Sequence, residues 1–305
     1  MQFTAVHWIG FFIILFILLS FDLGIFNKKS HRISFKEAIL YTILWITVAL
    51  IFDLIIYNVF DHRKALDFLT GYLLEYSLSV DNIFVFLLIF SYFKVEAKYQ
   101  HKVLFWGIIG AIVFRLTLIF VGTELMKKFE WIIYVFGIFL IISGIRMLFP
   151  SKEEGNIEKN PLVNILKKIF PVTSDFVNGK FFVKQSGKFF MTPLFIVLTI
   201  LESTDIVFAL DSIPAVLSIT QDPFIVFTSN AFAILGLRSL YFAITGFMDK
   251  FRFLKVGLSI ILVYIGIKMC ISDIVHISTE ITLLILFVIL SLSVLLSIII
   301  KPKKE

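Results

Sequence analysis

The sequence has little charge and almost no cysteine. Only 16% of its 305 residues are Asp, Glu, Lys or Arg, whereas about 25% is usual for a soluble globular domain. The single cysteine, Cys270, cannot form a disulfide within the chain. The sequence also lacks a phosphate-binding loop and any catalytic motif. These absences argue against a soluble fold, an enzyme, a bound cofactor and ATP-driven transport by this chain alone.

Long apolar runs stand where the charge is missing. The apolar set makes up 59% of the chain, and several runs exceed the roughly 18 residues that cross a bilayer. The first run has no basic segment before it, so we expect a retained helix rather than a cleaved signal peptide. We therefore predict an all-α, polytopic protein of the lipid bilayer. Its nine spans would lie at about residues 5–26, 38–60, 68–93, 103–123, 131–149, 191–219, 223–247, 253–271 and 278–300.

The basic residues sort to one side of this arrangement. If the nine helices alternate in direction, 21 of the 28 Lys and Arg residues fall on one side and 5 on the other. The remaining two, Arg115 and Arg238, lie inside spans. Because positive residues stay on the cytoplasmic side, the pattern predicts an outside N-terminus and an inside C-terminus. The net charge of +6 then belongs to loops, and we expect no nucleic-acid partner.

Two parts of the chain resemble each other. Three matches occur in order, at offsets of 124, 123 and 122 residues: Ser79–Phe84 with Ser203–Phe208, Arg115 with Arg238, and Gly144–Met147 with Gly266–Met269. The unit is three helices, so the copies cross the membrane in opposite directions. Inverted repeats of this kind place the substrate of a transporter near the midplane, between the halves. A duplication kept only for packing is the alternative.

The repeat divides the chain into five parts. We predict two N-terminal helices (1–66), a first three-helix repeat (67–149), a cytoplasmic loop (150–190), a second and inverted repeat (191–272), and a C-terminal helix with a basic tail (273–305).

Acidic residues lie inside the spans of both repeats. Asp81 and Asp205 are near the middle of the third and sixth spans. Each such Asp costs about 2.5–3.5 kcal/mol on insertion scales, so it must face a cation, a base, water or another acid. The same two spans also carry Glu75, Glu202 and Asp211.

Pro214 bears on the direction of Asp211. A regular helix would point Asp211 about 120° away from Asp205. Pro214 has no N–H and crowds the carbonyl of Leu210, so we expect a kink that turns Asp211 toward the site.

The predicted site is rich in oxygen ligands. Besides the carboxylates it offers the Asn82 amide, main-chain carbonyls, and the hydroxyls of Ser79, Ser203 and Thr204, with no His or Cys nearby. Carboxylate, carbonyl and water suit Mg²⁺, Ca²⁺ and Mn²⁺, whereas Cu and Zn favour thiolate or imidazole. We therefore predict a transport site for a hard divalent cation, with protons as the coupling ion.

Other interpretations of these residues stay open. Asp81 with Arg115 and Asp205 with Arg238 could form ion pairs that serve only the structure. Arg115 and Arg238 could instead contact the substrate of an anion or amino-acid exporter, or the chain could be a non-transporting membrane scaffold. Oligomer formation and protein partners are equally open. Asp22 and Asp53 lie near span ends, where we expect interfacial positions.

Several segments resemble the signatures of the TerC family. They are Gly71–Asn82 with Phe84–Phe86, Tyr99–Gly107, Asp205–Ala215 and Phe232–Phe242, and Phe21–Gly24 also fits the family's first helix. The match covers nearly the whole chain except the 150–190 loop. The resemblance implies a bacterial inner-membrane protein of the lysine-exporter superfamily, linked to tellurium resistance and implicated in manganese export. It makes Mn²⁺ the expected substrate and export its direction. The acids at matching positions are Glu75, Asp81, Glu202, Asp205 and Asp211.

Overall fold

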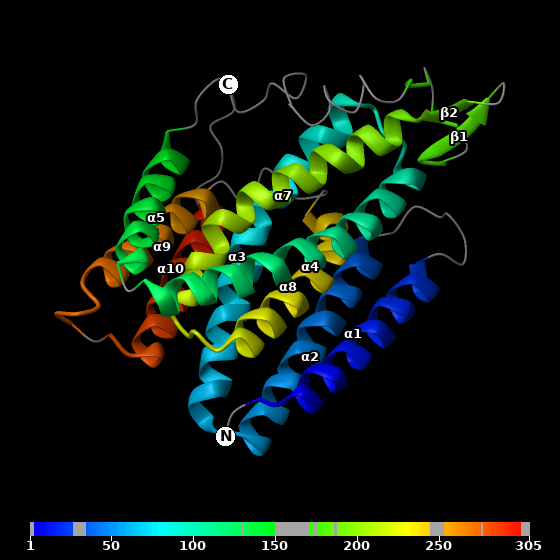
Figure 1. The fold of residues 1–305 in the computed structure, drawn as a ribbon. Coiled ribbons are helices and arrows are strands. Elements are labelled where there is room, and N and C mark those ends of the chain that lie inside the picture. The colour runs from blue at the N-terminus through cyan, green and yellow to red at the C-terminus, as the bar shows by residue number, and fades with distance from the viewer. Residues whose placement is uncertain are drawn as a thin grey trace.

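A bundle of helices with one small β-hairpin forms the computed structural model (Figure 1). The structure describes residues 3–26, 35–129, 131–149, 171–173, 176–177, 179–185, 188–244, 253–275 and 277–299, with side chains except at 23–26, 81, 84, 185, 188 and 298. The helices in this part are α1 (Ala5–Phe26), α2 (Phe35–Val59), α3 (His62–Tyr92), α4 (Ala97–Lys128), α5 (Ile132–Leu148), α7 (Pro193–Leu217), α8 (Pro223–Ile244), α9 (Leu254–Cys270) and α10 (Thr279–Ile299).

The all-α membrane architecture is confirmed. Among the described residues, seven helices are long and apolar enough to cross a bilayer, namely α1, α2, α3, α4, α7, α8 and α10. Helix α5 is apolar but shorter, with 17 residues. The number of spans and the sides on which the termini lie stay predictions.

Local capping explains where two of the central helices begin. The Asp61 carboxylate accepts a hydrogen bond from the main-chain N–H of Lys64 (2.8 Å), which satisfies a free donor in the first turn of α3. Asp222 does the same for the N–H of Phe224 (3.1 Å) at the start of α8. Helix α8 also begins at Pro223, whose missing N–H costs nothing in a first turn.

Helices α3, α4, α7 and α8 form the centre of the bundle (Figure 1). Helices α1 and α2 lie along one edge, and α5, α9 and α10 lie along the opposite one. Burial follows this order, since 94% of the α8 span is buried and only 17% of the α1 span is. The centre therefore places polar side chains of α3, α4, α7 and α8 away from lipid.

The contact between α5 and α9 obeys the symmetry that the repeat predicts. At the offset of 122 residues, Gly144 corresponds to Gly266 and Gly137 to Ser259. A Cβ on Gly144 would lie 2.8 Å from the Ser259 carbonyl oxygen, and one on Gly266 would lie 2.5 Å from the Gly137 carbonyl oxygen. If each residue is replaced by its counterpart in the other repeat, the first contact becomes the second. Both helices have 17 residues and run antiparallel, as inverted copies must.

The four central helices follow the same relation. Gly71 of α3 meets Ser229 of α8, and Tyr76 meets Gly236, so these two helices run parallel. Helix α4 is likewise parallel to α7, because Gly110 meets Glu202 and Gly122 meets Leu217. In the repeat, α3 corresponds to α7 and α4 corresponds to α8. The α3–α8 pair therefore corresponds to the α7–α4 pair. Helix directions in the described part thus agree with an inverted repeat.

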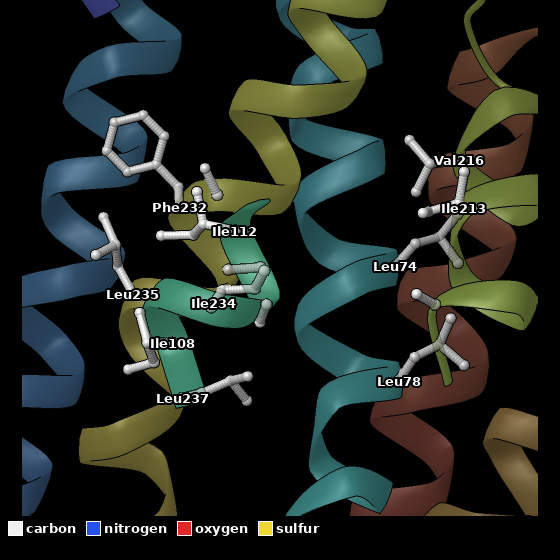
Figure 2. Packing of buried hydrophobic residues seen from close by; sticks show 14 of the residues in the cluster. Leu74, Leu78, Ile108, Ile112, Ile213, Val216, Phe232, Ile234, Leu235 and Leu237 are labelled. Carbon is white, nitrogen blue, oxygen red and sulfur yellow. The ribbon is translucent and has the colours of Figure 1, made fainter. Parts of the chain in front are cut away.

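Apolar packing fixes which face of each helix turns inward. Figure 2 shows Leu74 and Leu78 of α3 against Ile213 and Val216 of α7. It also shows α4 packed on α8, through Ile108, Ile112, Ile234 and Leu237. All of these side chains are buried.

The last part of the predicted cytoplasmic loop contains a β-hairpin. Strands β1 (Phe182–Gln185) and β2 (Lys188–Met191) pair antiparallel, with Phe182 opposite Met191. Helix α7 accordingly begins at Pro193, after the strand, and not at residue 191. Residues 150–170 lie outside the described part of the chain.

Candidate functional site

A fully buried arginine joins three of the central helices. Arg115 of α4 is 0% exposed and is the largest fully buried side chain in the described part of the chain. Its Nη2 donates to Asp205 Oδ1 (2.8 Å) and its Nε to Asp205 Oδ2 (3.1 Å), which is a two-point contact with the middle of α7. Its Nη1 donates to Glu75 of α3 and, at 3.4 Å, to the Ser212 hydroxyl. Such paired guanidinium–carboxylate bonds are among the strongest in proteins.

A small cavity lies beside this cluster. Its volume is about 30 Å³, and its polar lining consists of Glu202, Asp205 and Arg238. A water molecule needs at least about 10–15 Å³ on this measure, so the cavity accepts a bare cation or about two waters. Asp205 therefore belongs both to the Arg115 cluster and to the cavity wall.

Two glycines of α4 make room for the Glu202 carboxylate. Its Oε1 lies 4.0 Å from where a Cβ of Gly107 would stand, and a Cβ on Gly110 would overlap the carboxyl group. Glu202 Oε2 is buried and has no hydrogen-bond partner among the described residues. A carboxylate oxygen in the membrane interior without a partner is unfavourable, so this atom marks a place for a cation, a proton or water.

The second arginine of the repeat has a different partner. Arg238 of α8 pairs with Asp22 of α1, with Nη2 2.6 Å from Oδ1 and 3.0 Å from the Asp22 main-chain oxygen. Asp22 is 1% exposed and therefore buried in the protein, while its expected position near the membrane interface stays a prediction. Sequence spacing could not reveal its partner, because the two residues are 216 positions apart.

The structure separates some of the predicted site residues. The proposed pairing of Asp205 with Arg238 is replaced by the pairs Asp205–Arg115 and Asp22–Arg238. Asp81 lies in α3, but its side chain is outside the described part, so its predicted roles as cation ligand and as partner of Arg115 stay predictions. Asn82 is 3% exposed and follows it on the same helix.

Asp211 does not turn toward Asp205. It accepts a hydrogen bond from the Ser143 hydroxyl of α5 (2.7 Å), and α7 stays helical through Pro214. The expected kink was therefore wrong in its consequence, and Asp211 keeps the direction of a regular helix.

The predicted hydroxyl ligands behave differently in the two repeats. Ser203 and Thr204 donate to the Ile200 carbonyl of their own helix, at 2.9 and 2.7 Å. Ser79 is 0% exposed, and its oxygen has no hydrogen-bond partner among the described residues. Sequence reasoning missed Ser212, which is buried 3.4 Å from Arg115 Nη1. Ser212 lies two helical turns after Asp205, so helical spacing could have found it.

No three acidic, histidine or cysteine side chains converge to enclose a metal ion within the residues that the structure describes. In this conformation the cavity offers two carboxylates, Glu202 and Asp205, from adjacent turns of α7. Mg²⁺ is usually held through one or two carboxylates together with several waters, which is more water than the roughly two molecules for which this cavity has room.

Comparison with known proteins identifies the family of the chain. The description "Integral membrane protein TerC family" matches residues 60–305. The chain belongs to the TerC family. The matched region of this TerC protein contains every residue of the Arg115 cluster and the cavity, and it leaves out α1 and Asp22.

The TerC chain is also similar to several known membrane proteins over nearly its whole length. It is 46% identical to an uncharacterized membrane protein of Myxococcus xanthus, over 96% of this chain and 92% of the other. It is 44% identical to the proposed membrane-bound redox modulator Alx of Salmonella typhi, over 96% and 94% of the two chains. Against Alx of Escherichia coli K12 the identity is 42%, with the same coverage. No solved structure matches the chain significantly.

Proposed function

We propose that this protein exports a divalent metal cation, Mn²⁺, across the bacterial inner membrane by alternating access of its two repeats. The observation that carries the proposal is the pair Glu202 and Asp205, which line one buried cavity at mid-helix. A cation in that cavity would supply the partner that Glu202 Oε2 lacks.

The charges around the cavity support a divalent substrate. With all groups ionised, the described carboxylates exceed the guanidinium groups by two negative charges, and Asp81 would raise the excess to three, so a divalent cation cancels more of this charge than a monovalent one. The groups are Glu75, Glu202, Asp205 and Asp22 against Arg115 and Arg238. The ligands are oxygens, which suit Mn²⁺, Mg²⁺ and Ca²⁺. Mn²⁺ is preferred among them because of the resemblance to the TerC family.

The structure also suggests how the acids divide their roles. Glu202 and Asp205 would bind the cation directly, with Asp81 and Asn82 of α3 as further ligands from the other repeat. Glu75 would hold Arg115, to which it is already bonded. Protons that return through the same carboxylates would drive export.

An exported amino acid or other organic anion fits the cavity poorly. Pockets for organic ligands usually measure about 300–1,000 Å³, and this cavity is about 30 Å³. Its two arginines, moreover, already have carboxylate partners.

A redox role, suggested by the names of the Alx relatives, would have to be indirect. Cys270 is the only cysteine in the chain, so the chain cannot cycle an internal disulfide. We infer that any redox effect follows from the metal that is moved.

Metal-resolved efflux from liposomes tests the proposal. The purified full chain should release loaded Mn²⁺, faster with a proton gradient, and should leave K⁺ inside. Asp205→Asn and Glu202→Gln should reduce Mn²⁺ release to the rate of protein-free liposomes. Glu124→Gln, which changes an exposed acid paired with Lys127 on α4, is the matched control and should transport normally. Normal Mn²⁺ efflux by both site variants would refute the site.

A further inference from the structure

Two positively charged groups can bind the Asp205 carboxylate: the Arg115 guanidinium and a cation in the cavity. Arg115 binds it through Nε and Nη2, while the cavity reaches it together with Glu202. A carboxylate that already accepts two guanidinium bonds has part of its charge compensated. A cation that enters the cavity must therefore compete with Arg115, which is a cation that is covalently part of the protein.

Glu75 offers Arg115 a second place to bind. Glu75 is 1% exposed, and only its Oε1 is bonded to Arg115. Its Oε2 is buried and has no partner among the described residues. The planar guanidinium matches a carboxylate at two points, so Arg115 can release Asp205 and take both oxygens of Glu75. The Ser212 hydroxyl stays within reach of Nη1 at 3.4 Å.

The charge of the entering ion decides whether this exchange occurs. At equal distance a divalent cation attracts a carboxylate twice as strongly as a guanidinium does, while a monovalent ion gains no Coulombic advantage. A monovalent ion would also have to replace two directed hydrogen bonds. On charge alone, a divalent cation therefore has an advantage over Arg115 at Asp205 that a monovalent ion lacks.

We propose that Arg115 is the residue that makes the site selective for divalent over monovalent cations. When metal is absent, Arg115 occupies Asp205 and neutralises it. A divalent cation drives Arg115 onto Glu75 and binds Asp205 and Glu202. When the metal leaves, Arg115 returns to Asp205. The inference rests on the proposed function and adds the origin of its charge selectivity.

Arg238 serves as the internal comparison. It matches Arg115 in the repeat, is 3% exposed and lines the same cavity, but its described ion pair is with Asp22 and not with a cation ligand. Changing Arg238 leaves Asp205 paired with Arg115, so it should not make Mn²⁺ binding sensitive to K⁺, although the positive charge lost from the cavity wall should tighten that binding as well.

Binding of Mn²⁺ alone, followed by the loss of its free-ion paramagnetic resonance signal, tests the inference on the purified full chain. Arg115→Gln should bind Mn²⁺ at least about tenfold more tightly, because one positive charge leaves the site. Excess K⁺ should now weaken that binding, whereas the same concentration of a bulky organic cation should not. The unmutated chain and Arg238→Gln should both ignore K⁺. Unchanged affinity and unchanged K⁺ response in folded Arg115→Gln would overturn the inference.

Glu75→Gln gives a test of opposite sign, which also applies if Arg115→Gln does not fold. Without the charge of Glu75, Arg115 has no alternative partner, so Mn²⁺ should bind at least about tenfold more weakly. In the Arg115→Gln background the same change should have less than about a threefold effect, because the two residues act as one unit. An equal loss in both backgrounds would make Glu75 a direct ligand and refute the exchange. Absence of Mn²⁺ binding by the unmutated chain would instead refute the proposed function.

Discussion

Arg115 and Arg238 occupy matching places in the two repeats and have different surroundings. Arg115 is held by acids of α3 and α7, so its ion pairs join one repeat to the other. Arg238 is held by Asp22 of α1, a helix outside both repeats. The two guanidinium groups lie at matching places in their helices but bind different partners. In the proposed mechanism Arg115 takes part in transport, whereas Arg238 ties an outer helix to the core.

The largest expected effect at the two arginine sites comes from Asp205→Asn. It removes a proposed cation ligand and leaves Arg115 with Glu75 as its charged partner at a position that is 0% exposed. Breaking a buried ion pair usually costs about 3–5 kcal/mol, and the remaining bond to Glu75 should keep the loss near the lower end. Thermal unfolding of the purified protein in detergent measures the stability, and metal titration measures Mn²⁺ binding, which should be lost. Mn²⁺ binding as tight as in Asp22→Asn would erase the distinction between the two sites.

A smaller effect should follow from filling the notch in α4, which is the space that Gly107 and Gly110 leave for the Glu202 carboxylate. Gly110→Ala places a methyl group on the Glu202 carboxyl, which has to leave the cavity wall. We expect a loss of about 1–3 kcal/mol from overpacking, together with weaker Mn²⁺ binding.

The matched control for this glycine is Gly10→Ala on α1. No atom lies within 4 Å of a Cβ at that position, so unfolding and Mn²⁺ binding should stay close to those of the unmutated chain. If Gly110→Ala behaves like Gly10→Ala in both assays, Glu202 does not depend on the notch.

The smallest effect on Mn²⁺ binding should come from Asp22→Asn. This change removes the charged partner of a buried arginine, while the main-chain oxygen of residue 22 keeps its bond to Arg238 at 3.0 Å. We expect a loss of stability of about 3–5 kcal/mol and little change in Mn²⁺ affinity. Thermal unfolding and metal titration check both. A Mn²⁺ affinity that falls as far as it does in Glu202→Gln would place Asp22 in the transport site.

Much of the architecture could be predicted because it depends on the length of the apolar runs and on the spacing of the repeated motifs. Apolar runs of membrane length indicated the helices, and three short matches indicated the repeat that the Gly144–Ser259 and Gly137–Gly266 contacts now support. Burial of acids inside those runs pointed to Glu75 and Asp205, which the structure brings to one arginine.

Partners across the bundle could not be predicted, because they depend on how helices pack and not on sequence spacing. Helical periodicity places Asp22 near the end of a span but cannot tell that Arg238 comes to meet it. Pro214 suggested a kink, yet packing keeps α7 regular and leaves Asp211 with Ser143. In the β-hairpin, the apolar residues around Phe182 and Phe190 were the available signal, and the lysines among them obscured it.

The short helices α5 and α9 have a consequence for the surrounding lipid. Seventeen residues of α-helix extend only about 26 Å, which is less than the hydrocarbon thickness of about 30 Å in a typical bilayer. Close backbone contact through their glycines leaves the pair little freedom to adjust. If both helices cross the bilayer, we expect the membrane to thin along this edge of the protein, or residues flanking the helices to reach to its surface. Vesicles made from lipids with longer acyl chains should oppose that thinning and strain the edge of the bundle to which α7 is hydrogen-bonded through Asp211 and Ser143.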